Sequence, residues 1–162
     1  MPKTRKLALM AMFTAASLIV FVIEAQIPAP IPVPGVKLGL ANIVTLIAMV
    51  MLGRREAGLI LLVRIAMGSM FTGGFSAFLY SVAGGVLAYA VMAALIGVLP
   101  MWVVSILAAI AHNFGQLALA VLVTGTPALF WYGPALLLAA ILTGAFTGFA
   151  AQYLSKAVRG RL

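Results

Sequence analysis

Apolar runs interrupted by short breaks of proline, glycine or charge make up most of the chain. A helix needs about 20 apolar residues to cross a bilayer, within a range of about 17–25. The pattern predicts one membrane-spanning helix for each of six runs, at about residues 7–25, 38–52, 57–71, 75–99, 101–123 and 134–154. The second and third runs are short for this role. We therefore expect an all-α integral membrane protein with six transmembrane helices in a single domain, residues 1–162.

The breaks between the runs differ in their chemistry. Within residues 26–39, every second residue from Pro28 to Pro34 is proline, which enforces extended geometry and predicts a stiff loop. The charged segment 53–56 predicts a turn, and Pro100 is expected to end the fourth run. The first run follows basic residues, as in a signal peptide. It is longer than the usual apolar segment of about 7–15 residues, so we expect a retained helix.

Composition excludes a soluble fold, because only 7% of the residues are charged, against about 25% in a soluble domain. The formal net charge of +8 reflects cations that flank the runs on one side: Lys3, Arg5, Lys6, Arg54, Arg55, Lys156, Arg159 and Arg161. By the positive-inside rule, both the N and C termini are cytoplasmic. We expect a multi-pass protein of a bacterial cell (plasma) membrane, surrounded by lipid. The cations lie in short turns, so nucleic acid is not expected as a partner.

The residue types that are missing exclude several classes of chemistry. Both acidic residues are glutamates, so the chain has no Asp to build an aspartate-rich Mg²⁺ site, and it has no Cys for a disulfide or an Fe–S cluster. A single His gives too few ligands for zinc. No GxxxxGK[ST] phosphate-binding loop is present. The sequence therefore predicts a protein that is not an enzyme and needs neither a cofactor nor a metal.

Two charged residues lie where lipid or protein interior is expected. Arg64 is in the middle of the third run, and Glu24 is near the end of the first. Charged groups within spans face the bundle interior and often mark function. Arg64 is interpreted either as an anion contact for a substrate or as one half of an ion pair with Glu24. Glu24 could instead bind a cationic group or pair with Lys37.

Uncharged polar residues cluster in the fifth run. His112 and Gln116 are four residues apart and share one helical face, and Asn113 adjoins it. Three hydrogen-bonding side chains on an apolar helix suggest a substrate-lining face. The alternative is interhelical hydrogen bonding, worth about 0.6 kcal/mol per contact.

The segment that joins the proline loop to the second run, residues 35–42, places Lys37 between glycines and ends at Asn42. A positive charge and free N–H groups at a helix start suit the capture of an anionic or carbonyl group. The predicted substrate-binding set is Lys37, Asn42, Arg64, His112, Asn113 and Gln116.

Small residues predict close helix contacts at two places. The first run carries a stripe of alanines, namely Ala8, Ala11, Ala15 and Ala16. The sixth contains Gly144 and Gly148 in a GxxxG pattern. Both patterns let helices approach closely. We interpret the glycines as packing within the bundle, and the alanines as a surface that could dock a partner helix.

Taken in order, these residues resemble the Gx transporter family, whose members are often labelled heptaprenyl diphosphate synthase component I. The resemblance covers nearly the whole chain. It rests on Glu24, Pro32-x-Pro34-Gly35-x-Lys37-Leu38-Gly39-Leu40-Ala41-Asn42, Arg64-x-x-x-Gly68-Ser69, Ser81-x-Ala83-Gly84-Gly85, His112-Asn113-x-Gly115-Gln116, Gly125-Thr126-Pro127 and Leu142-Thr143-Gly144-x-x-Thr147-Gly148.

The family is similar in layout to the substrate-binding S components of energy-coupling factor (ECF) vitamin transporters. The resemblance implies a six-helix S-component-like bundle with a small-molecule pocket on its outer side. It also implies that the alanine stripe docks a coupling subunit, with ATPases acting in trans. The expected function is uptake of a small vitamin-like or amphipathic molecule. The alternative is a non-catalytic membrane accessory subunit of prenyl diphosphate or quinone metabolism, since the absence of Asp argues against catalysis.

Overall fold

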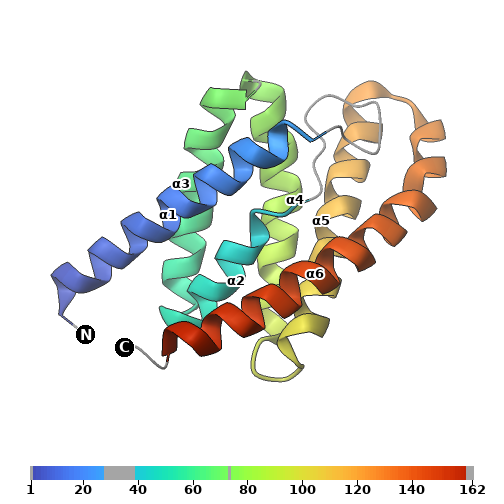
Figure 1. The fold of residues 1–162 in the computed structure, drawn as a ribbon. Coiled ribbons are helices and arrows are strands. Elements are labelled where there is room, and N and C mark those ends of the chain that lie inside the picture. Colours follow the sequence, from blue (N-terminus) through green and yellow to red (C-terminus); the bar gives the residue numbers. More distant parts are fainter. Residues whose placement is uncertain (1, 28–38, 73, 160–162) are drawn as a thin grey trace.

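The computed structural model of the protein describes residues 2–27, 39–72 and 74–159. The described elements are six α-helices and one 3₁₀-helix, η1 (Figure 1). Their bounds are α1 Lys3–Ala25, α2 Asn42–Met51, α3 Arg54–Thr72, α4 Gly74–Leu95, α5 Met101–Thr124, η1 Pro127–Tyr132 and α6 Gly133–Arg159. The predicted proline loop and Lys37 fall within residues 28–38, which lie outside the described residues.

The prediction of a helical membrane protein is confirmed. Four helical segments are long and apolar enough to cross a bilayer, namely Lys3–Ala25, Gly74–Leu95, Met101–Thr124 and Pro127–Ala157. The ten-residue helix α2 is about 15 Å long, half of a bilayer core about 30 Å thick. Helix α3 has 19 residues and includes four charged ones. Six complete spans therefore remain a prediction.

Several helix boundaries differ from the expected ones. Helix α1 begins at Lys3 and α3 at Arg54, ahead of the expected residues 7 and 57, so most of the segment 53–56 that was predicted as a turn is helical. Helix α2 begins later than expected, at Asn42, and α6 ends later, at Arg159. The fourth run was expected to continue to residue 99, but α4 ends at Leu95 because the chain turns at Gly97, which has a φ of +88°. This left-handed conformation suits glycine. Residues 127–132, expected as loop, form η1, with Pro127 in its first turn. The proline fixes a helical φ and lacks the N–H that a helix start leaves unpaired.

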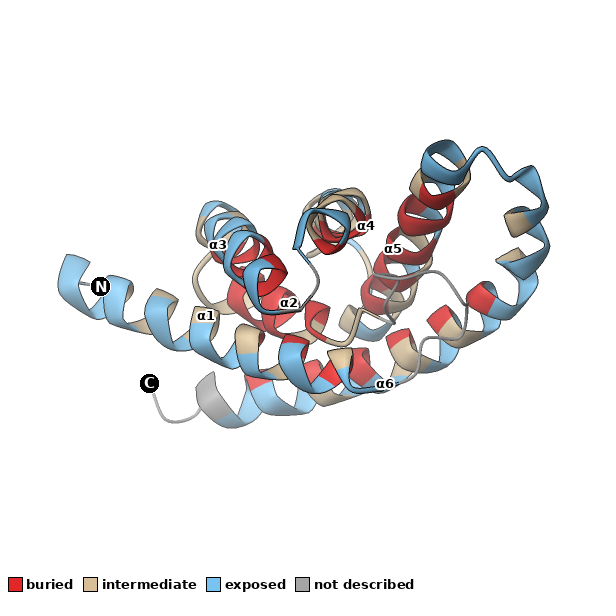
Figure 2. Cartoon of the chain, turned by 90° about the horizontal axis from the view of Figure 1, so that it is seen from above, coloured by how far each residue is buried: buried red, intermediate tan, exposed pale blue. Residues whose placement is uncertain are grey.

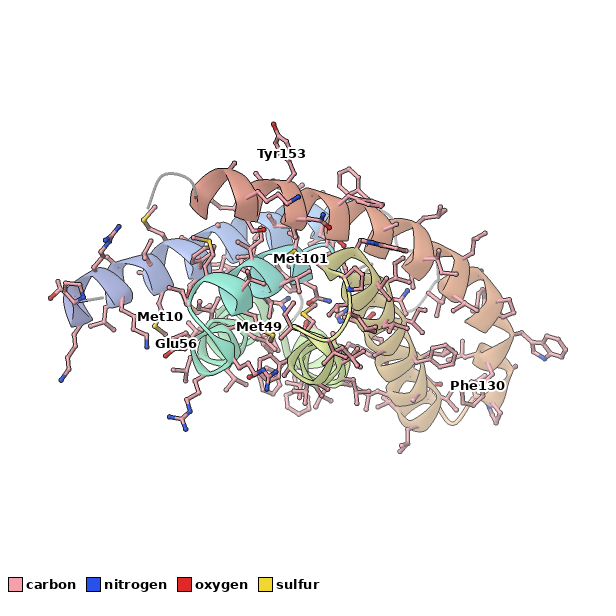
Figure 3. The ribbon with its side chains drawn as sticks, turned by 90° about the horizontal axis from the view of Figure 1, so that it is seen from below. Met10, Met49, Glu56, Met101, Phe130 and Tyr153 are labelled. Carbon is pink, nitrogen blue, oxygen red and sulfur yellow. The ribbon has the colours of Figure 1, made fainter. Side chains whose placement is uncertain are left out.

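The ends of α1, α3 and α6 that carry the cations gather at one end of the molecule, which we call the basic end. The start of α1 and the finish of α6 lie toward the same side of the molecule in Figure 1. Lys6 of α1 forms an ion pair with Glu56 of α3. Figure 3 labels Glu56 at this end of the molecule. The Tyr89 hydroxyl of α4 donates a hydrogen bond to the Arg54 carbonyl oxygen at 2.9 Å. These contacts join α1 and α4 to the start of α3 at the basic end.

The Lys6–Glu56 pair should make the packing of α1 on α3 depend on pH. The hydrogen bond from Lys6 is the largest of the interactions that lower the pKa of the Glu56 carboxyl. A carboxyl with a lowered folded-state pKa stabilises the fold above its unfolded pKa, and this contribution is lost as pH falls through the folded value. Wild type should therefore melt slightly above Glu56→Gln at neutral pH, and the gap should close in acid. Lys6→Gln should behave alike; a gap independent of pH would contradict the assignment.

The core lies between α2, α3, α4, α5 and the C-terminal part of α6. Leu46 and Ala48 of α2 are fully buried, together with Val104 and Ala108 of α5. Figure 2 shows the buried residues on the facing sides of these helices, whereas most of α1 is exposed. Helix α1 buries only Ser17, Phe21 and Glu24.

Close contact between α5 and α6 depends on the predicted GxxxG pattern. A Cβ added at Gly144 would lie 2.6 Å from the Cα of Ile106, and one at Gly148 would lie 2.6 Å from the Cα of Trp102. The hydroxyls of Ser105 and Thr147 hydrogen-bond across this contact at 2.9 Å. The interpretation of these glycines as packing within the bundle is therefore confirmed.

Candidate functional site

Buried polar side chains from four helices converge on one cavity away from the basic end. Glu24 of α1, Arg64 of α3, Ser81 of α4, and His112 and Gln116 of α5 line it. Phe21 and Gly39 complete the wall. Its free volume is about 10 Å³, which is room for about one water molecule. Three of the lining residues were predicted from the sequence as substrate ligands, namely Arg64, His112 and Gln116.

Glu24 fastens the start of α2 to the end of α1. One carboxylate oxygen, Oε1, accepts a hydrogen bond from the Gly39 N–H, and the other, Oε2, accepts one from the Ala41 N–H at 3.3 Å. A negative charge at a helix start also interacts favourably with the helix dipole. These N–H groups, expected to be free for a ligand, already have an acceptor. Glu24 therefore organises the wall of the cavity through backbone contacts.

An ion pair between Glu24 and Arg64 was predicted, and the structure shows an electrostatic interaction between the two side chains. Both side chains line the cavity. Among the described residues, the one salt bridge recorded joins Lys6 and Glu56 instead. Direct pairing of Glu24 with Arg64 stays a prediction, and pairing with Lys37 lies outside the described residues.

Arg64 is a buried cation with unused hydrogen-bonding capacity. Its side chain is 3% exposed, and the guanidinium carbon lies 5.4 Å from the centre of the Phe21 ring. Within the described part of the chain, Nε and Nη2 have no hydrogen-bond partner. Leaving a buried donor unpaired costs about 1–3 kcal/mol, and more for a charged group. Nε and Nη2 form one edge of the guanidinium, which matches the two oxygens of a carboxylate.

His112 offers a second polar atom in the same region. Its Nδ1 lies 3.4 Å from Nδ2 of Asn42, the residue that begins α2. Its Nε2 is buried and has no partner among the described residues. The predicted ligands Asn42 and His112 are thus brought together, with one ring nitrogen left unpaired.

Asn113 is separated from the rest of the predicted substrate-lining face. Its amide Nδ2 donates to the Leu136 carbonyl oxygen of α6 at 3.1 Å, and it is not among the residues that line the cavity. One residue step on a helix rotates the side chain by about 100°, so Asn113 faces α6 while His112 and Gln116 face the cavity. This geometry favours an interhelical hydrogen bond for Asn113.

Two cavity residues were missed as candidates. Ser81 belongs to a Ser-x-Ala-Gly-Gly motif that was visible in the sequence, but a lone serine in an apolar run gave no reason to select it. Phe21 looks the same in sequence as a lipid-facing aromatic. Only the packing shows that it lies beside the Arg64 guanidinium.

Gly84 sets the position of the His112 ring. A Cβ at residue 84 would lie 2.8 Å from Nδ1 and Cε1 of His112 and 2.9 Å from Cγ of Gln116. Gly84→Ala should therefore displace both cavity side chains and reduce the retention of any small molecule that binds there. The matched control is Gly133→Ala, whose added Cβ would meet only Cδ2 of Leu117 at 4.0 Å, away from the residues that line the cavity. Mass spectrometry of extracted small molecules measures both, and equal retention would show that Gly84 does not shape the site.

Comparison with known proteins places the chain in a family. A family model described as heptaprenyl diphosphate synthase component I matches residues 13–154. A search of curated proteins and one of solved structures each found no match. The matched range includes every residue that lines the cavity. The similarity to ECF S components stays a prediction, whereas the predicted family is confirmed: the chain belongs to the heptaprenyl diphosphate synthase component I family.

Proposed function

We propose that the protein is an S-component-like membrane subunit that binds a small vitamin-like or amphipathic molecule for uptake. The observation that carries this proposal is the buried Arg64 guanidinium, whose Nε and Nη2 have no partner among the described residues. A cation held in a membrane domain is expensive unless something pairs with it. A ligand with a carboxylate or a similar anionic group would supply the missing acceptor, and the His112 Nε2 would bind a second polar group.

The small free volume limits how such a ligand binds. The cavity of about 10 Å³ is far below the range of about 300–1,000 Å³ that is usual for ligand pockets. Binding therefore requires the surrounding helices to separate. Since no phosphate-binding loop is present, separate ATPase and coupling subunits would supply the energy. Ala8, Ala11, Ala15 and Ala16 are all exposed on α1, which suits their proposed role in docking a coupling subunit.

The proposal includes an orientation, with six spans in a bacterial plasma membrane and the basic end in the cytoplasm. The chain has no cysteine, so single cysteines can be labelled without background. Trp131 in η1 and Val98 between α4 and α5 are 87% and 75% exposed at opposite ends. An impermeant maleimide should label Trp131→Cys in intact cells and Val98→Cys only after permeabilisation. The reverse pattern would invert the orientation, and labelling of both in intact cells would overturn the six-span arrangement.

A second candidate is a non-catalytic accessory subunit of prenyl diphosphate or quinone metabolism. The family description favours it, because a component of a synthase implies a partner protein. The absence of Asp leaves catalysis to that partner.

One experiment separates the two functions. The full chain is expressed in bacterial cells, purified in mild detergent and analysed by native mass spectrometry. A bound anionic small molecule that is lost in Arg64→Met but retained in the exposed control Arg55→Met supports substrate binding. A stable complex with a prenyl synthase and no small molecule supports the accessory role and overturns the first proposal.

A further inference from the structure

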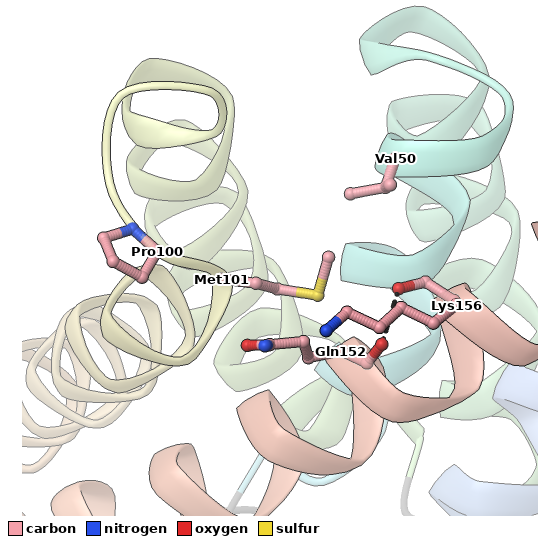
Figure 4. Close-up of a pocket in the computed structure, with 6 residues that line it drawn as sticks. Val50, Pro100, Met101, Gln152 and Lys156 are labelled. Carbon is pink, nitrogen blue, oxygen red and sulfur yellow. Dashed lines mark hydrogen bonds between the residues drawn. The ribbon is translucent and has the colours of Figure 1, made fainter.

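Two hollows lie on either side of α6 at the basic end, and they share Gln152 and Lys156. The first has a volume of about 300 Å³ and lies between α2, the start of α5 and α6 (Figure 4). Its lining residues are Val50, Pro100, Met101, Gln152, Ser155 and Lys156. The second, of about 320 Å³, is lined by Phe149, Gln152, Tyr153 and Lys156. Both are distinct from the cavity around Arg64.

The shared residues offer polar groups to an incoming ligand. Lys156 extends into the first hollow beside Met101 and Gln152 (Figure 4). No salt bridge of Lys156 is recorded among the described residues. The Ser155 hydroxyl donates to the Gln152 carbonyl oxygen at 3.0 Å, so Lys156 and the Gln152 amide remain as the ligand-binding groups.

The charge of the basic end favours an anion. The described side chains at this end include the cations Lys3, Arg5, Lys6, Arg54, Arg55 and Lys156. The one acid at the same end, Glu56, is already paired with Lys6. A basic pocket between membrane helices on the side that carries the positive residues suits a phosphate headgroup.

The second hollow indicates that the anion is attached to a lipid. Tyr153 is 76% exposed and Phe149 is 57% exposed, on a helix that is long and apolar enough to span the bilayer. Phe149 is fixed by stacking on Trp102, with the ring centres 5.8 Å apart. A bound molecule that reaches both hollows would therefore place one part beside Lys156 and another along aromatic side chains that face lipid.

We propose that Lys156 and Gln152 bind the phosphodiester headgroup of an anionic phospholipid at the basic end, with an acyl chain along Phe149 and Tyr153. The site is independent of the substrate proposed for the Arg64 cavity. Arg64→Met should therefore leave lipid binding unchanged, which keeps the failure of one proposal distinct from the failure of the other.

The test is native mass spectrometry of the full chain from bilayers with equal amounts of phosphatidylglycerol and phosphatidylcholine. Wild type should retain phosphatidylglycerol in preference. Lys156→Gln should lower that retention about fivefold, the effect of one cation near an anionic surface. The matched control, Lys3→Gln, removes an exposed lysine at the same end that lines neither hollow. Equal losses in the two variants would mean general surface charge and would overturn the site.

Two further measurements separate a lipid from free phosphate. Tyr153→Ala should reduce retention of long-chain phosphatidylglycerol but not of a short-chain form, because only the long chain reaches the aromatic face. Broadening of the ³¹P signal of inorganic phosphate in lipid-free detergent, abolished by Lys156→Gln, would assign the site to soluble phosphate and overturn the proposal. Circular dichroism checks that each variant is folded. Lys156→Arg keeps the positive charge and should retain phosphatidylglycerol at the wild-type level.

Discussion

Replacing Arg64 by Met should weaken binding of the proposed anionic ligand by about thirtyfold or more, because removing one partner of a buried charge pair costs about 2–5 kcal/mol. The same change should leave the free energy of unfolding nearly unchanged or raise it. Methionine fills the volume of the side chain without a charge to desolvate, and the Glu24 carboxylate keeps the two backbone N–H groups that donate hydrogen bonds to it. Quantitative mass spectrometry of the bound molecule and thermal melting in detergent measure the two effects.

The pair of measurements also distinguishes the two interpretations of Arg64. If the guanidinium instead compensates Glu24 structurally, Arg64→Met would leave a buried carboxylate without its counter-charge and destabilise the fold by about 3–5 kcal/mol. Arg64→Lys is the informative companion, since it keeps the charge but loses the planar two-donor edge. We expect the Lys variant to be as stable as wild type and still to bind poorly. Normal binding by Arg64→Met would remove Arg64 from the site.

Gly144→Ala or Gly148→Ala should lower the free energy of unfolding by about 1–3 kcal/mol, the usual cost of inserting a methyl group into a filled interface. The reason is geometric, because each added Cβ would lie 2.6 Å from a backbone Cα of α5. A backbone atom cannot rotate away as a side chain can, so the two helices must separate. The hydrogen bond between Ser105 and Thr147 would lengthen with them.

The control for this prediction lies on the same helix. Gly133 begins α6, and a Cβ there would meet only Cδ2 of Leu117 at 4.0 Å, an ordinary contact. Gly133→Ala should therefore be neutral, or stabilising by up to about 1 kcal/mol through its better helix propensity. Denaturant or thermal melting of the three variants measures the difference. If all three unfold alike, α5 and α6 do not pack at these glycines.

Much of the fold could be predicted because apolar runs and their breaks carry direct physical meaning. The GxxxG pattern marked the contact of α6 with α5. The charged segment at residues 53–56 was predicted as a turn, yet α3 already begins at Arg54, because arginine and glutamate are good helix formers when they lie outside the apolar run. The end of α4 was placed too late because Pro100 was taken as the stop. The earlier stop is Gly97, whose positive φ ends the helix, and a glycine shortly before a proline is a common helix C-terminal signal. The 3₁₀-helix η1 was missed because its aromatic residues are equally typical of a loop at the membrane surface.

The site was predictable only in part. A charge within an apolar run is conspicuous, so Arg64 and Glu24 could be selected from their positions alone. The partners of Glu24 could not be predicted. Its carboxylate oxygens accept hydrogen bonds from backbone N–H groups, and such groups do not stand out in a sequence. The sequence grouped Asn113 with Gln116, yet the amide of Asn113 is bonded to a carbonyl of α6. Side-chain identity gives hydrogen-bonding capacity, whereas the tertiary arrangement decides which helix uses it.

The attachment of α1 has a thermodynamic consequence. Its buried face supplies Phe21 and Glu24 to the cavity, and its alanines are exposed on the outside. A protein that binds those alanines and shifts α1 must change the energy of the cavity, because the Glu24 carboxylate holds the first residues before α2. By linkage, ligand in the cavity must then change the affinity for that protein by the same factor. Helix α1 would thus couple occupancy of the cavity to the affinity for a protein bound along its exposed alanines.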